Sequence, residues 1–180
     1  MKLINTKIDG FFLIESKVFE DERGFFLETY SEKKFNTLGI KDVFVQDNHS
    51  HSTKGVLRGM HFQLKNPQAQ VVSVIRGKIF DVVVDLRKDS PTFGQWEGME
   101  ISDKSNIRQV YMCPGLAHGF LTLSDTVDLH YKVSRIYNPD DECGLIWNDP
   151  DINIDWPKTN YKVSKRDMGF EPFIQLIERL

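Results

Sequence analysis

The chain has 180 residues, of which 40% are hydrophobic, and a formal net charge of −3. This length suits a single domain over residues 1–180, large enough to be stable without a disulfide or a structural metal. The lack of a basic excess argues against a general nucleic-acid-binding protein, although a few arginines gathered in one pocket can still bind a small anion.

The cysteines and the N-terminal segment indicate in which cellular compartment the protein is expected. Cys113 and Cys143 are not part of a CxxC motif or a Cys/His-rich segment, so neither a zinc site nor a redox pair is expected. Residues 1–19 carry polar and acidic side chains and lack the long apolar stretch of a signal peptide. No run approaches the ~18 apolar residues of a membrane span. We therefore expect a cytoplasmic protein with reduced thiols and no membrane contact.

The first predicted elements are two strands and a helix. Residues 11–19 and 24–30 have the apolar, aromatic-rich pattern of strands, and the turn sequence DERG leads from one to the other. Residues 31–39 form the first predicted helix, in which Ser31 can cap the N-terminus and Gly39 is placed to end it.

Strand patterns then dominate to residue 149, separated by clusters of Gly, Pro, Asn, Asp and Ser. The predicted strands are 43–48, 56–63, 69–77, 78–87, 92–102, 108–115, 117–125, 127–137 and 144–149. Because no βαβ alternation is present, an all-β sandwich or barrel is expected, and a jelly roll of about 8 strands fits best. Apolar residues at helical spacing within 170–180 predict a packing helix at the C-terminus.

Five histidines are candidates for chemistry, and a metal site is one interpretation of them. His49 and His51 have the one-residue separation of a barrel metal motif, but no carboxylate follows them closely. The position two residues beyond His61 is Gln63, so that histidine does not start such a motif either. The sequence therefore favours a protein without a bound metal.

General acid–base chemistry requires only one base, one acid and donors for a developing oxyanion. His61, in VLRGMHFQ, and Tyr131, in VDLHYKV, are the natural candidates. His130 and Tyr131 must point to opposite faces of their strand, so at most one of them faces the interior. A core aromatic with a locally satisfied hydroxyl is the alternative interpretation of Tyr131.

Arginines are candidates for binding phosphate, because a guanidinium makes bidentate hydrogen bonds to such groups. Arg23, Arg58 and Arg166 are the candidates, and a surface salt bridge is the alternative for each. Arg58 is favoured because it lies in an otherwise apolar strand, where an unpaired charge would be costly.

Several long motifs together resemble one family, the dTDP-4-dehydrorhamnose 3,5-epimerases of the cupin superfamily. The resemblance runs from about Lys2 to Asp167 and is carried by DERGFFLETY, FVQDNHSHS, VLRGMHFQ, GKIFDVVVDLRKDSPTFGQW, PGLAHGF, HYKVSRIYNPDDE and IWNDPDINIDWP. It implies a double-stranded β-helix, a homodimer with exchange of N-terminal strands, and no metal or organic cofactor. The implied substrates are nucleotide-linked 4-keto-6-deoxy sugars, in which carbon 3 or carbon 5, or both, are inverted.

The resemblance also implies a role for each matching residue. His61 matches the base that removes a proton, Asp167 the carboxylate that orients it, and Tyr131 the acid on the opposite face. The other matching positions are substrate contacts. Arg58 and His118 match positions near the sugar and diphosphate, Tyr137 matches the aromatic that stacks on the base, and Glu142 and Arg166 match further binding positions, Arg166 in place of a lysine. The nucleotide and phosphate contacts, some of which reach across the dimer, are matched by Arg23, Glu28, Gln46 and Asn48.

One position departs from the family pattern. Gln70 stands where the family has a lysine whose charge stabilises the enolate oxygen. An amide donates a hydrogen bond but has no charge, and the loss of one oxyanion donor typically costs about 3 kcal/mol. We therefore expect a variant 4-keto sugar or the inversion of a single carbon, with Arg58, Gln70 and His118 sharing the oxyanion.

Two other functions remain open at this point. A 3,4-ketoisomerase of the same fold would move a proton along one face and would not need an opposed tyrosine, so Tyr131 counts against it. A non-catalytic sugar-nucleotide-binding module would not need His61 or Asp167, and both are present. A metal-dependent barrel enzyme is a more distant alternative.

Overall fold

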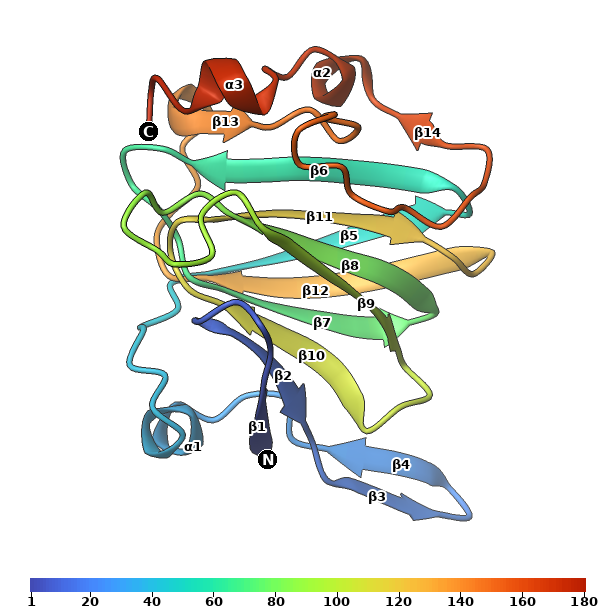
Figure 1. Cartoon of the computed structure of the whole chain (residues 1–180). Coiled ribbons are helices and arrows are strands. Elements are labelled where there is room, and N and C mark those ends of the chain that lie inside the picture. The colour runs from blue at the N-terminus through green and yellow to red at the C-terminus, as the bar shows by residue number, and fades with distance from the viewer.

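The computed structural model describes residues 1–180 and shows two antiparallel sheets packed face to face (Figure 1). The first sheet has the order β1 (Lys2–Asn5), β2 (Phe11–Glu15), β10 (Ile107–Met112), β7 (Gln70–Arg76), β12 (Thr126–Val133) and β5 (Gln46–Thr53). The second has the order β13 (Glu142–Gly144), β6 (Val56–Gln63), β11 (Leu116–Thr122), β8 (Lys78–Asp85) and β9 (Trp96–Ser102), with β14 (Lys162–Val163) parallel to β6. The prediction of an all-β, cupin-like jelly roll is confirmed.

The main core lies between the two sheets. Val72 and Leu129 of the first sheet pack with Ile79, Val83 and Phe120 of the second in one buried cluster. Side chains alternate between the two faces of each strand, so every second residue of these strands belongs to this core.

The second sheet is covered on its outer face as well. The C-terminal segment places Trp156 and Leu176 against Val82 and Val84 of β8, and all four side chains are buried. A strand covered on both faces is mostly apolar, which explains why residues 78–87 are rich in β-branched side chains.

The helices are short and lie near the chain termini (Figure 1). The first is α1 (Glu32–Thr37), which buries Phe35 on the outer face of the first sheet and is followed by Gly39 at a φ of +97°. Ser31 occupies the N-cap position as predicted, but its side chain makes no capping hydrogen bond. The others are the 3₁₀ turn η1 (Pro139–Asp141), α2 (Lys165–Met168) and α3 (Phe173–Leu176), so the predicted C-terminal helix is only one turn long.

Several strand predictions were wrong in their bounds. The predicted strand 11–19 is divided between β2 and β3 (Val18–Asp21), which belong to different sheets, 92–102 begins only at Trp96, and 127–137 ends at Val133. β5 begins at Gln46, not at residue 43, and it continues through the polar HSHS segment to Thr53. The predicted strand 144–149 ends at Gly144, and the chain then turns, with the backbone N–H of Asp149 donating to the carbonyl of Ile146.

A separate hairpin projects from the sandwich beside the first sheet (Figure 1). Its strands, β3 (Val18–Asp21) and β4 (Gly24–Leu27), pair only with each other. Phe19, Phe25 and Phe26 are 53%, 58% and 70% exposed there, so much apolar surface is left uncovered in a single chain. No helix of the chain is both long and apolar enough to cross a membrane.

Candidate functional site

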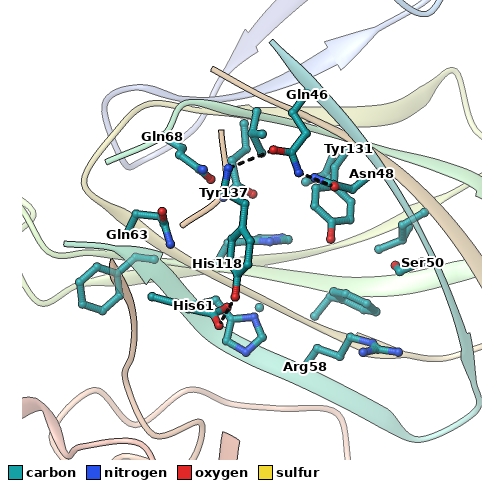
Figure 2. Close-up of a pocket in the computed structure, with 18 of the residues that line it drawn as sticks. Gln46, Asn48, Ser50, Arg58, His61, Gln63, Gln68, His118, Tyr131 and Tyr137 are labelled. Carbon is teal, nitrogen blue, oxygen red and sulfur yellow. Dashed lines mark hydrogen bonds between the residues drawn. The ribbon is translucent and has the colours of Figure 1, made fainter. Parts of the chain in front are cut away.

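A cavity of about 370 Å³ opens between the two sheets, and Figure 2 shows polar side chains pointing into it from both. Ten of the thirteen predicted site residues line it. They are Gln46, Asn48, Arg58, His61, Gln70, His118, Tyr131, Tyr137, Glu142 and Arg166. Asp167 lies directly behind His61, whereas Arg23 and Glu28 lie elsewhere in the chain.

A single hairpin supplies part of each wall. β5 belongs to the first sheet and β6 to the second, and only Lys54 and Gly55 separate them. Alternation along β5 turns Gln46, Asn48 and Ser50 into the cavity. β5 is polar because it lies beside the cavity, and this polarity is why the sequence pattern revealed only part of the strand.

His61 reaches the cavity from β6 and has a buried carboxylate behind it. Its Nε2 lies 3.1 Å from Oδ1 of Asp167, whose side chain is only 3% exposed. The Nη2 of Arg166 also approaches Nε2, at 3.3 Å. The other ring nitrogen, Nδ1, has no hydrogen-bond partner within the chain, so it is the nitrogen that can meet a ligand.

Asp167 remains a carboxylate because its hydrogen bonds outweigh its burial. Burial alone would raise the pKa of Asp167, but hydrogen bonds from His61 and from the backbone N–H of Gly59, at 3.1 Å, hold that pKa far below the ordinary aspartate range. A permanent carboxylate at this place orients the imidazole and stabilises its protonated form.

Gly59 allows β6 and β11 to approach closely at this point. Its φ is +130°, and a Cβ atom at this position would lie 2.5 Å from the Cα of Gly119 on β11. Only glycine satisfies both conditions without displacing a neighbouring backbone. Gly59 therefore allows β6 and β11 to lie close together and also presents the N–H group that binds Asp167.

Tyr131 reaches the cavity from β12, on the wall opposite to His61. Burial raises the pKa of its phenol above the ordinary value, and nearby Arg58 offsets part of that increase. The phenol is therefore protonated at neutral pH and can donate a proton. His130 lies on the outer face near Asp47, as strand alternation predicts.

Arg58 carries a charge that no carboxylate neutralises. Its Nε donates to the Oγ of Ser52 at 3.1 Å, and its Nη2 donates to the backbone oxygen of His51 at 3.3 Å. A cation with only neutral partners at a cavity wall is suited to bind an anion such as a phosphate.

Arg166 is neutralised by two carboxylates at the rim of the same cavity. Its Nη1 lies 2.6 Å from Glu142, and its Nε lies 3.2 Å from Asp167. The hydroxyl of Tyr137 also donates to Glu142, at 2.8 Å, and the backbone N–H of Tyr137 donates to Gln46. These contacts place an aromatic ring and an arginine next to each other at the cavity.

His118 has a buried partner that the sequence did not reveal. It lies on β11 directly opposite His61 in the strand register, and its Nε2 is 2.7 Å from Oδ1 of Asp81 on β8. The Asp81 side chain is completely buried. The only signal was the presence of acidic residues, Asp81 and Asp85, inside the apolar segment KIFDVVVDLR, which we interpreted as a buried strand and nothing more.

Arg23 and Glu28 are not part of the cavity of their own chain. Arg23 lies at the turn of the projecting hairpin and pairs with Asp21, whereas Glu28 pairs with Lys34 at 2.7 Å. Gln70 does face the cavity, and no hydrogen-bond partner within the chain holds its amide.

The histidine pair considered as a metal motif lies outside the cavity. His49 and His51 are on the outer face of β5, and both contact the Asp128 carboxylate of β12, at 3.2 and 2.9 Å. No three His, Cys, Asp or Glu side chains of the chain are grouped so that they could hold a metal ion.

Comparison with known proteins gives a consistent result. The family model for dTDP-4-dehydrorhamnose 3,5-epimerase matches residues 5–175. The enzyme of that name from Methanothermobacter thermautotrophicus is 48% identical over 174 residues, which are 95% of this chain and 94% of the relative.

Solved structures agree with this match. A dTDP-6-deoxy-D-glucose-3,5-epimerase from Legionella pneumophila, in complex with dTDP-4-keto-L-rhamnose, superposes with a TM-score of 0.91 at 46% identity, covering 95% of this chain and 92% of that one. A 3′-monoepimerase from Streptomyces bikiniensis, in complex with dTDP-quinovose, has a TM-score of 0.89 at 33% identity, covering 99% and 90%.

Proposed function

Because the chain belongs to the dTDP-4-dehydrorhamnose 3,5-epimerase family, we propose that it inverts carbon 3, carbon 5 or both in a nucleotide-linked 4-keto-6-deoxy sugar. The observation that carries this proposal is the placement of His61 and Tyr131 on opposite walls of one cavity. Inversion at a carbon requires a base on one face and an acid on the other, and this arrangement supplies both.

The proposed reaction begins with removal of a proton beside the ketone. The carbonyl at carbon 4 acidifies the hydrogens on its neighbours, and Nδ1 of His61 takes one of them. The electron pair of the broken C–H bond moves to the carbon-4 oxygen and forms an enolate, while Asp167 stabilises the new imidazolium. Tyr131 then delivers a proton to the opposite face, after which solvent reprotonates the phenolate and takes up the proton held by His61. These proton transfers require no cofactor.

The substrate fits the charges and rings around the cavity. We expect Arg58 to bind the diphosphate and Tyr137 to stack on the base, because both line the cavity and Arg58 has no carboxylate partner. Arg166 lies at the rim beside them, where Glu142 and Asp167 already pair with it. Solved relatives hold dTDP-4-keto-L-rhamnose or dTDP-quinovose, so we take dTDP as the nucleotide. The unpaired Cys113 and Cys143 fit a cytoplasmic enzyme.

Inversion of a single carbon is a second candidate, and Gln70 favours it. The amide faces the cavity but carries no charge, which weakens stabilisation of the enolate oxygen. A less stabilised enolate restricts the reaction to the more acidic or better-placed carbon. Relatives named for a single centre are known in this fold, such as the Streptomyces bikiniensis 3′-monoepimerase.

We also propose that the enzyme is a homodimer in which the projecting hairpin reaches the partner. The hairpin exposes Phe19, Phe25 and Phe26, and apolar side chains gathered in this way mark a contact surface. Arg23 and Glu28 lie at or just after this hairpin and outside the cavity of their own chain. An exchanged hairpin would bring them to the nucleotide in the cavity of the partner.

Solvent deuterium exchange tests the reaction directly. With dTDP-4-keto-6-deoxyglucose in deuterated water, NMR should show deuterium entering carbon 3, carbon 5 or both, with inverted configuration. Labelling of both carbons at similar rates would exclude the single-centre candidate. His61→Asn should abolish exchange at both carbons, and exchange that survives this change would show that another group is the base.

The same experiment separates the alternatives. A 3,4-ketoisomerase would move the ketone along the ring, and the product spectrum would show a carbonyl at carbon 3. A binding module would bind dTDP without any exchange. Either result would reject the proposed epimerase.

A further inference from the structure

Asp81 is in an unusual position for a carboxylate. Its side chain has no solvent exposure, and in the register it lies opposite Phe120 and Met99 within the core between the sheets. Its Oδ1 contacts His118 at 2.7 Å, and its Oδ2 has no hydrogen-bond partner. A buried carboxylate is costly unless another charge compensates it.

His118 is the only group that can compensate this charge. It is the single side chain that makes a hydrogen bond or ion pair with the Asp81 carboxylate, and its own side chain is 13% exposed at the cavity. If Nε2–H donates to Asp81, the pair becomes a balanced ion pair only when Nδ1 is also protonated. His118 then has a positively charged ring with one N–H left over for a ligand.

The cavity otherwise lacks a free cation on this side. Gln70 is neutral, and Arg166 is already paired with Glu142 at 2.6 Å and with Asp167 at 3.2 Å. Arg58 is the one remaining guanidinium in the cavity. If Arg58 binds the diphosphate, as proposed above, the enolate oxygen has no charged donor other than His118, which lies opposite the base His61 in the strand register.

We propose that Asp81 is a positioning residue that keeps His118 doubly protonated and aimed at the carbon-4 oxygen, so that this imidazolium replaces the charge of the lysine missing at position 70. The inference rests on the proposed function. No bond to His118 is made or broken: it donates a hydrogen bond from Nδ1 while His61 takes the proton from carbon and the electron pair moves to the oxygen.

A double-mutant cycle tests the proposal. Asp81→Asn keeps the size and one acceptor but removes the negative charge, and it should lower kcat for deuterium exchange roughly 100-fold with KM nearly unchanged, as for the loss of an oxyanion donor. Gln70→Lys supplies a charge independently. In that background the loss caused by Asp81→Asn should shrink to less than about tenfold. An equal loss in both backgrounds, or no loss in either, would overturn the proposal.

The matched control is Asp85→Asn, four residues along the same strand. Asp85 is equally buried, but it bonds Arg87, Ser90 and Thr92 and does not line the cavity. Its change should lower the free energy of unfolding and leave kcat of the folded enzyme unchanged. A fall in kcat as large as that of Asp81→Asn would mean that any buried charge on β8 matters, and the proposal would be wrong.

A measurement on the unmodified protein covers the case in which Asp81→Asn does not fold. Nitrogen-15 NMR of labelled histidines, with the signal assigned from His118→Gln, should show both ring nitrogens of His118 protonated at neutral pH. A neutral ring would refute the inference. If the unmodified enzyme shows no deuterium exchange at all, the proposed function fails, and this spectrum still decides whether the Asp81–His118 ion pair exists.

Discussion

His61 and Tyr131 differ in how the surrounding structure prepares them. The Nε2 of His61 is occupied by Asp167 and Arg166, so only Nδ1 is available to a ligand. The Tyr131 phenol is kept protonated by burial, which raises its pKa. These surroundings suit His61 to the proposed role of base and Tyr131 to that of acid, and the two side chains come from opposite sheets.

This division of roles predicts a specific defect for Tyr131→Phe. Without the acid, the enolate can be reprotonated only from the side of His61, which returns solvent deuterium to the original face. Deuterium uptake with retained configuration is expected, while the rate of inversion falls by about 10²–10⁴. NMR of the labelled sugar measures both quantities. Normal inversion in this variant would show that another group is the acid.

The sequence could supply some of these residues and not others. His61 and Arg58 were identified because a polar side chain in an apolar strand needs a functional or structural explanation. Tyr131 was ambiguous because the sequence does not show that its strand forms the cavity wall opposite to His61. Asp167 was predicted only from the family resemblance. Asp81 was missed because its partner, His118, lies on another strand, and contacts between strands are not visible in a local pattern.

At the scale of elements, the positions of polar residues decide how well a strand can be recognised. β8 is covered on both faces, and its β-branched run was identified at once. β5 has the cavity on one face and solvent on the other, so it is polar on both and was recognised only in part. The end of β13 was misplaced because the backbone of Ile146 bonds to Glu171, a contact distant in the sequence that a local pattern does not show.

The segment that follows β8 depends on the buried Asp85, and this dependence should vary with pH. Burial would raise the pKa of Asp85, but hydrogen bonds from Arg87, Ser90 and Thr92 lower it to about 2. The unfolded chain has an aspartate pKa of about 3.9. Because the folded pKa is the lower one, the stabilisation is complete above the unfolded value and is lost as pH falls through about 2.

We therefore expect the difference in unfolding free energy between the unmodified protein and Asp85→Asn to be about 2 kcal/mol larger at pH 6 than at pH 2. Urea denaturation at several pH values measures it. Asp125→Asn is the control, because the Asp125 side chain is 97% exposed. A difference for Asp85→Asn that stays constant between pH 6 and pH 2 would contradict the assigned hydrogen bonds.

At the scale of the whole molecule, the projecting hairpin is the part that a single chain does not explain. Its three phenylalanines are each more than half exposed, in contrast to the buried apolar clusters of the sandwich. The local pattern predicted an aromatic strand here, but burial by another chain leaves no distinct mark in a sequence. The homodimer was therefore predicted from the resemblance alone.

Two variants separate assembly from nucleotide binding. Phe26→Asp places a charge on the exposed hairpin surface, and sedimentation should show a monomer with weakened dTDP binding.

Arg23→Ala should leave the dimer intact and weaken dTDP binding roughly tenfold, as expected for one charge-assisted hydrogen bond. Ile174→Asp, at an exposed position on α3, should change neither property. An unmodified protein that sediments as a monomer would contradict the proposed exchange.

The short corner at Lys54 and Gly55 has a consequence for how a ligand is held. Backbone hydrogen bonds tie this corner to Asp125 and Thr122 on one side and to Lys162 on the other. From this corner, β5 carries Asn48 to one wall of the cavity and β6 carries His61 to the opposite wall. These hydrogen bonds hold the two strands at a fixed separation here, so we expect the corner to limit the thickness of a ligand that fits between the sheets.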